Sequence, residues 1–159
     1  MKIAITGGKP ASESDILALE SALGCRLSAA FRTFVEANDG AEPENNVFKV
    51  GSHNESGVRQ FIPVAAILDE LTFLDDLSTH AYPIAWDESG NYVVIDEDQQ
   101  GAVFFWDHEL PEPLTKLASD FGEFLNLLQP FDPASVQLKL GQVESAWIDP
   151  EFLKLLEEK

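Results

Sequence analysis

Apolar residues in the first third of the chain recur every three or four positions, which is the spacing of an amphipathic helix. The apolar positions from 16 to 23 predict one helix, with Ser12 as its N-cap and a stop at Gly24. The apolar positions from 31 to 35 predict a second helix, which begins after Ser28. The chain therefore opens with two short helices.

Between residues 82 and 109 the pattern changes to short apolar runs separated by polar turns, which is typical of strands. We expect three strands, at 83–86, 92–96 and 102–107, joined by turns at 87–91 and 98–101. Such short connections favour antiparallel hairpins. Two further strands are expected nearer the N-terminus, at 2–6 and 47–50.

Two more apolar stripes have helical spacing. The first predicts a helix over 64–74, and the second, bounded by prolines on both sides, predicts a longer helix over 114–128. Asp149-Pro150 is a good helix start for the last nine residues. We therefore expect one α+β domain over 1–159, with a core at about 12–130 and a C-terminal extension at 131–159. Its fold would be two N-terminal helices, a central antiparallel sheet of about four to six strands and a packed C-terminal helix.

Charge narrows the classes of partner. The chain has 28 acidic and 10 basic residues, a net charge of −18, and residues 60–115 contain twelve acidic residues but no Lys or Arg. Binding to nucleic acid or to an anionic membrane draws on clustered cations, so neither is expected. Solubility alone is one explanation of such a charge, and a basic partner is the other. Without a long apolar run or a secretory signal, the expected location is the cytoplasm.

The candidates for catalysis are weak. His108 lies between two acids, but neighbouring strand residues point to opposite faces, so a surface histidine is the better interpretation. Asp96-Glu97-Asp98 has no second acidic motif to complete a metal site, and Cys25 has no activating base near it in sequence. The segment 6–10 lacks the phosphate-loop pattern. We therefore expect no catalytic residue, no metal and no cofactor.

Three motifs, taken in order, resemble the SUKH superfamily, the domain of yeast cell-wall synthesis regulators of the Smi/Knr type and of many bacterial immunity proteins. The motifs are LGCRLSAAFRTF (23–34) with NDGA (38–41), PIAWDESGN (83–91) with Ile95-Asp96, and VFFWDHE (103–109) after Gly101 with LASDFGEFL (117–125). The resemblance spans about 15–128. It implies a non-catalytic α+β fold, and for bacterial relatives it implies neutralisation of a co-encoded toxin, often a nuclease.

The resemblance and the charge together predict a binding surface for a basic protein toxin domain, because nuclease faces that bind polyanions carry Lys and Arg. The predicted contact residues are Trp86, Asp87, Glu88, Asp96, Glu97, Asp98, Asp107 and Glu109. The hairpin order divides the acids into two patches at opposite ends of the strands, both held outward. Trp106 is expected in the core, whereas Trp86, near an acidic turn, is a candidate anchor.

Three functions remain open on the sequence. The first is an immunity protein, a monomer or a weak homodimer that inhibits its toxin stoichiometrically. The second is a regulatory scaffold of the cell-wall-regulator type without a toxin partner. The third is an enzyme or metal-dependent hydrolase that uses His108 or the 96–98 cluster. The sequence does not name the partner.

Overall fold

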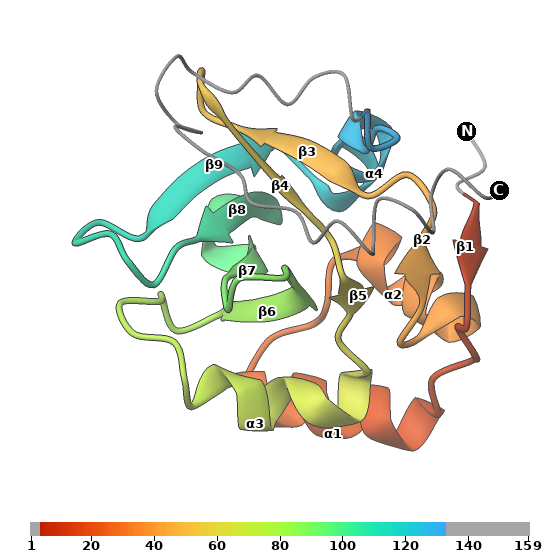
Figure 1. Ribbon diagram of the computed structural model, residues 1–159. Helices are drawn as coiled ribbons and strands as arrows, with labels where there is room; N and C mark the ends of the chain where they lie inside the picture. The colour runs from red at the N-terminus through yellow and green to blue at the C-terminus, as the bar shows by residue number, and fades with distance from the viewer. Residues whose placement is uncertain (1–3, 133–159) are drawn as a thin grey trace, which may run out of the picture.

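The computed structural model describes residues 4–132, and the predicted helix at the end of the chain lies outside them. Figure 1 shows a central sheet with helices packed against it, so the α+β prediction is confirmed. The sheet has five antiparallel strands in sequence order. These are β5 (Gln60–Phe61), β6 (Ala81–Trp86), β7 (Tyr92–Asp96), β8 (Ala102–Trp106) and β9 (Leu114–Ala118).

Two further strand pairs stand beside this sheet. The first joins β1 (Ile5–Thr6) to β2 (Glu42–Pro43), and the second is the hairpin of β3 (Val47–Val50) and β4 (Asn54–Gly57). The β3–β4 hairpin stands out from the body of the molecule in Figure 1. It is anchored by Phe48, which is buried and packs edge-on against Phe105 and Phe124. The strand at 47–50 was predicted, but its partner was not.

The two opening helices, α1 (Glu13–Leu23) and α2 (Ala29–Asn38), form where the periodicity predicts them. Ser12 caps α1 as expected, because its side chain accepts a hydrogen bond from the N–H of Asp15. Ser28 precedes α2 but makes no such bond. Its hydroxyl instead donates a hydrogen bond to Glu97, the residue directly after β7.

The predicted helix over 64–74 is shorter in the structure. A 3-10 turn, η1 (Val64–Ala66), leads into α3 (Ile67–Leu71), and the chain then continues as a loop to β6. This segment covers one face of the sheet. Its Glu70 accepts hydrogen bonds from Trp86 and Tyr92, and the carbonyl of Asp75 accepts one from the indole N–H of Trp106.

The prediction of one helix over 114–128 is wrong. Residues 114–118 form β9, which pairs with β8 at the edge of the sheet, and only Phe121–Leu127 form helix α4. The side chain of Asp120 accepts from the N–H of Glu123 and so begins the helix there. Leu114 and Leu117 are three residues apart and continue the helical spacing of the apolar residues in α4, so the pattern did not mark where the helix begins.

The core on the other face of the sheet is rich in phenylalanine. Helices α2 and α4 contact each other through aromatic pairs with ring centroids 5.2 Å apart for Phe31 and Phe121, and 5.3 Å apart for Phe34 and Phe121. The largest fully buried side chains include Tyr82, Phe31, Phe61, Phe121 and Phe124. Each buried aromatic removes a large apolar area from water, so this layer holds the helices to the sheet.

Glu97 joins the helical layer to the sheet. One of its carboxylate oxygens accepts hydrogen bonds from the N–H of Ser28 at 2.7 Å, the hydroxyl of Ser28 at 2.6 Å and the hydroxyl of Tyr82 at 2.6 Å. Gly101 lies directly against this contact, since a Cβ atom there would stand 2.7 Å from the Ser28 oxygen. Glycine is therefore required at 101 for both space and backbone angle (φ +78°).

Gly101→Ala should thus destabilise the fold more than a matched change at Gly51. Gly51 also has a positive φ (+65°), but a Cβ atom there would meet nothing within 4 Å. Gly51→Ala should cost about 1 kcal/mol for backbone strain. Gly101→Ala should cost at least about 1 kcal/mol more, because Ser28 must move off Glu97. Urea unfolding of both variants measures the difference, and equal losses would contradict this account of Gly101.

Candidate functional site

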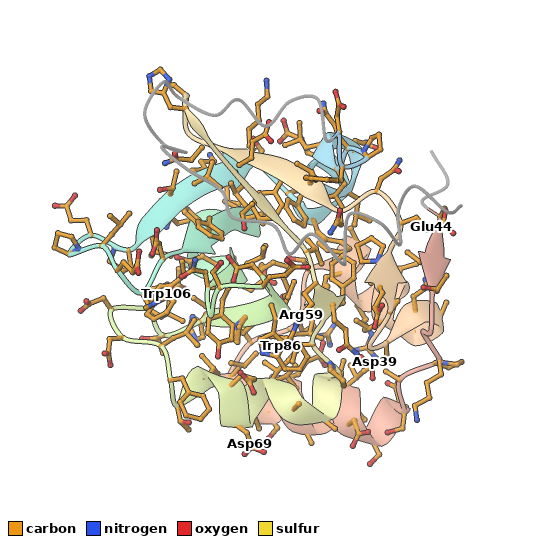
Figure 2. All side chains as sticks on the ribbon, in the orientation of Figure 1. Asp39, Glu44, Arg59, Asp69, Trp86 and Trp106 are labelled. Atoms are coloured by element: carbon orange, nitrogen blue, oxygen red, sulfur yellow. The ribbon has the colours of Figure 1, made fainter. Side chains whose placement is uncertain are left out.

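The loops at one end of the sheet form the surface of interest, which we call the loop end. Trp86, Tyr92 and Trp106 are paired across β6, β7 and β8, so the 87–91 turn and the 107–113 connection leave the sheet side by side. The tip of the β3–β4 hairpin lies beside them, because residues 50–56 line a hollow together with Asp107 and Leu110. Trp106 marks this end of the molecule in Figure 2.

A groove runs along the loop end. It consists of two adjoining hollows, of about 540 Å³ and 470 Å³, which share Glu55, Ser56, Asp87 and Ser89 in their walls. Glu88 lines the first hollow and Asp107 lines the second. Within residues 4–132, no Lys or Arg lines either hollow. We call this feature the acidic groove.

Apolar side chains border the acidic groove. Phe131 lines the first hollow and is 63% exposed, and Leu110 lines the second and is 48% exposed. Exposed apolar residues beside a polar groove are a common mark of an interaction site. The groove therefore offers both charge and apolar surface to a ligand.

Asp87 forms the floor of the groove and is 5% exposed. One carboxylate oxygen accepts from the N–H groups of Ser89 and Asn91, and the other accepts from the side chains of Asn91 and Ser56. The expectation that Asp87 is held outward is therefore wrong. A carboxylate with four donors is the acceptor that closes its own turn and joins that turn to β4.

His108 is oriented by an amide. Its ring Nδ1 lies 2.6 Å from Oδ1 of Asn91, which also accepts from the His108 backbone N–H, so the ring nitrogen must donate. The neighbouring Asp107 instead accepts from the backbone N–H of Glu109. Among the described residues, no carboxylate is hydrogen-bonded to this ring. Glu88 and Glu109 are exposed, and Asp107 is half-buried.

Trp86 is half-buried, and both its polar atom and one ring face are already in contact. The indole N–H donates to Glu70 at 2.9 Å, and the Arg59 guanidinium lies 5.4 Å from the ring centroid, as Figure 2 shows for the labelled pair. Tyr92 donates to the same Glu70 oxygen, and burial followed by that bond raises the pKa of Tyr92 to about 12. Trp106 is 7% exposed, so its predicted place in the core is confirmed.

The second group of predicted acids lies at the opposite end of the sheet, as the strand order predicted, but two of its members face inward. Asp96 is 4% exposed and accepts from the N–H of Asp98 and the side chain of Gln99. Glu97 is half-buried and holds Ser28 and Tyr82. The expectation of an outward acidic patch at 96–98 is therefore wrong for Asp96 and Glu97.

Asp98 is exposed and pairs with His80, whose Nδ1 lies 2.7 Å from its carboxylate. The hydrogen bond from His80 lowers the pKa of Asp98. Arg32, by contrast, pairs with Glu13, Glu20 and Glu36 of the two opening helices. Within the described part of the chain, the predicted loop-end carboxylates therefore have no ion pair with Lys or Arg.

Cys25 lies in the α1–α2 connection and is half-buried. Burial, followed by the charges of Glu97, Asp98 and Glu20, raises the pKa of its thiol. A raised pKa reduces the thiolate fraction and is the reverse of what a nucleophilic cysteine needs. A search of residues 4–132 finds no group of three or more His, Cys, Asp and Glu side chains that could hold a metal ion.

Several groove residues had no signal in the sequence. Strand β4 has the sequence NESG, which has low strand propensity, so Glu55 and Ser56 fell outside the predicted elements. Asn91 gave no sign that it orients both the turn and His108. Glu55 and Ser56 could have been found only by predicting a hairpin partner for the strand at 47–50.

The chain belongs to the SMI1 / KNR4 family (SUKH-1), whose model matches residues 10–127. The match runs from just before α1 to the end of α4 and confirms the resemblance seen in the motifs. Membership supports a domain of the immunity-protein or cell-wall-regulator kind, a class that is generally non-catalytic. Comparison with curated proteins gave no match. None of the helices within residues 4–132 has the length and apolar character needed to cross a membrane.

The two neighbouring acids of the 87–91 turn should differ sharply when replaced. Asp87→Ala removes the four hydrogen bonds of a buried carboxylate and should lower the free energy of unfolding by about 2–4 kcal/mol. Glu88→Ala, at an exposed position, should change it by less than about 0.5 kcal/mol. Urea unfolding measures both values. An Asp87→Ala variant as stable as Glu88→Ala would show that the turn does not depend on this carboxylate.

The contact between Asp98 and His80 gives a pH-dependent contribution. Because the folded pKa of Asp98 is lowered, its stabilising effect is present above the ordinary carboxyl pKa of about 4 and is lost as pH falls through the folded value. The stability difference between the parent protein and Asp98→Asn should therefore be present at about pH 5 and shrink toward zero in acid. Urea midpoints between pH 2 and pH 7 measure it, and a difference that persists at the acid end would refute the assignment.

Proposed function

We propose that this protein is an immunity protein, a non-catalytic domain that binds a basic toxin domain and neutralises it by covering its active face. The single observation that carries the proposal is the acidic groove, whose described walls contain carboxylates without an accompanying Lys or Arg. The family to which the chain belongs supports the same kind of domain. We expect it to act in the cytoplasm, as a monomer or weak homodimer.

The electrostatic argument concerns the encounter with the partner. A nuclease or similar toxin binds a polyanion, so its working face carries Lys and Arg. A chain of net charge −18 attracts such a face over a Debye length, about 8 Å at physiological salt, and complementary charge raises the association rate. An acidic surface that occupies this face keeps the natural substrate away from it.

Affinity at close range requires a few anchors with apolar surface. Trp86 is a poor anchor, because Arg59 and Glu70 already contact it. Phe131 and Leu110 border the groove, are exposed and are better placed. The proposed contact set is therefore revised. It keeps Glu88, Asp107 and Glu109, gains Glu55, Leu110 and Phe131, and assigns Asp87, Asp96 and Glu97 to the fold.

A regulatory scaffold of the cell-wall-regulator type is the second candidate, because the same family membership supports it. Two observations separate the candidates. An immunity protein requires a toxin gene beside its own, and its steering by charge weakens steeply as salt rises. A scaffold requires neither, so binding to its partner that is unchanged in 1 M salt would favour it.

Charge reversal at the loop end tests the proposal. The double variant Glu88→Lys/Glu109→Lys should weaken binding to the toxin domain encoded by the neighbouring gene by at least about tenfold, or about 1.4 kcal/mol. Both positions are exposed, so the fold should be kept. Titration calorimetry in 50 mM and 500 mM salt measures the effect, which should be larger at low salt.

The control variant changes net charge equally at a distant place. Glu42 and Glu44 are exposed on and beside β2, and Figure 2 shows Glu44 on the opposite side of the molecule from Trp106. Glu42→Lys/Glu44→Lys should leave affinity within about threefold of the parent, because neither side chain lines the acidic groove and only long-range, screened attraction is lost. Equal losses in the two double variants would show that total charge matters and that the groove does not.

A further inference from the structure

Strand β4 has an outer edge whose backbone groups are free. In the β3–β4 hairpin, Val47 is opposite Gly57 and Lys49 is opposite Glu55. Both backbone groups of Val47 bond Gln129, on the side away from β4, so Val47 and Gly57 form a non-hydrogen-bonded pair. The alternation of the ladder gives the same geometry to Lys49 and Glu55.

It follows that the N–H and C=O groups of Glu55 and Gly57 point away from β3. Within residues 4–132, no hydrogen bond is made by these groups. Both residues line the first hollow of the acidic groove, whose far wall is formed by Asp87, Glu88 and Ser89. The free edge of β4 therefore faces a groove with room for another chain.

We propose that the partner inserts an extended, basic segment into the acidic groove, where it adds as a strand to the outer edge of β4. This rests on the proposed function and names the element through which the partner binds. Each of the two edge residues supplies one donor and one acceptor to the added strand. Hydrogen bonds to the free edge set the register of the segment, and the acidic residues of the groove favour a segment with basic side chains.

Because side chains alternate along a strand, the register determines which acidic residues each side of the partner segment faces. Ser56 is opposite Phe48, which is buried, and its hydroxyl donates to Asp87. A partner residue opposite Ser56 therefore projects inward, toward Glu88 and Ser89, and its two neighbours project to the side of Glu55. A Lys or Arg on the inward side meets Glu88, whereas on the other side Glu55 already lies opposite Lys49.

Charge disfavours the other occupants of this edge. A second copy of the chain would set the acids around Glu55 and Glu88 against their own equivalents, and like charges across a strand pair destabilise it. Residues 133–159 contain three Lys against five Asp and Glu, a net charge of −2 by subtraction. A basic segment from another protein is the occupant whose charge complements the groove.

The probe for this proposal is a synthetic peptide of eight residues with alternating Lys and Thr, used with the full chain. In two further peptides of the same charge, the backbone nitrogen of every Lys, or of every Thr, carries a methyl group. Each peptide therefore lacks alternate backbone N–H donors. Fluorescence titration should show that at least one methylated peptide binds about tenfold more weakly than the parent peptide, since a strand needs those donors. Equal affinity of all three peptides would overturn the added strand.

The protein side is tested at Gly57. Gly57→Pro removes the outward N–H without removing a bond of the β3–β4 ladder, and should weaken peptide binding by about tenfold. Gly57→Ala adds a comparable carbon, 3.2 Å from the Asn46 side-chain nitrogen, and keeps the N–H, so it should bind the peptide more tightly than Gly57→Pro does. Circular dichroism checks that both variants are folded.

Other results separate the two proposals. In one outcome, Gly57→Pro binds the peptide as tightly as Gly57→Ala, while Glu88→Lys abolishes binding. The groove then selects the peptide by its charge alone, and only the added strand is refuted. If Glu88→Lys also has no effect on peptide binding, the acidic groove is not the binding surface, and the proposed function is contradicted as well. If the parent protein does not bind the peptide, or sediments as a dimer that Gly57→Pro dissociates, the edge has another occupant and the added strand is wrong.

Discussion

The structure depends on carboxylates that accept hydrogen bonds at the two ends of the central sheet. Asp87 at one end and Asp96 at the other close the turns of the meander, and Glu97 holds the start of α2 against β6 through Ser28 and Tyr82. Buried polar groups are costly unless they are paired, and these three are paired within the fold. Glu97 thus joins α2 to the sheet beside the aromatic core, while Asp87 and Asp96 hold the turns, although the sequence pattern assigns all three acids to the surface.

The acidic residues therefore have two different roles, one within the fold and one at the surface. Part of the acidity is structural, and an acid that closes a turn is not available to a partner. Of the predicted contact acids, Glu88, Asp107 and Glu109 remain at the loop end, and Glu55, which lies opposite Lys49 on β3, joins them there. The opposite end keeps only Asp98 exposed, and that residue is paired with His80. The case for a basic partner therefore rests on one end of the sheet.

The β3–β4 hairpin gives this end its shape. A two-stranded hairpin is marginal by itself, and Phe48 attaches it to the core, while Ser56 attaches it to Asp87 across the groove. The contact that completes the 87–91 turn thus also positions the free edge of β4. A family that accepts many partners on one scaffold is expected to vary such loops and hairpins and to keep the sheet beneath them.

The sequence by itself determined the local elements and the family. Helical spacing located α1 and α2, and alternating apolar runs with polar turns located β6, β7 and β8, because these patterns depend on neighbouring residues alone. The family followed from three short motifs in order. The strand β9 was mistaken for helix because Leu114 and Leu117 continue the helical spacing of the apolar residues in α4, and only the pairing with β8 makes this segment a strand.

The site was decided by tertiary structure. Sequence named Glu88, Asp107 and Glu109, and these lie at the loop end, but it could not distinguish them from Asp87, Asp96 and Glu97. A carboxylate is acidic in either role, and its role depends on which donors the fold brings to it from distant segments, such as Ser56 for Asp87 and Ser28 for Glu97. The groove and the free edge of β4 likewise exist only once the hairpin packs beside the sheet.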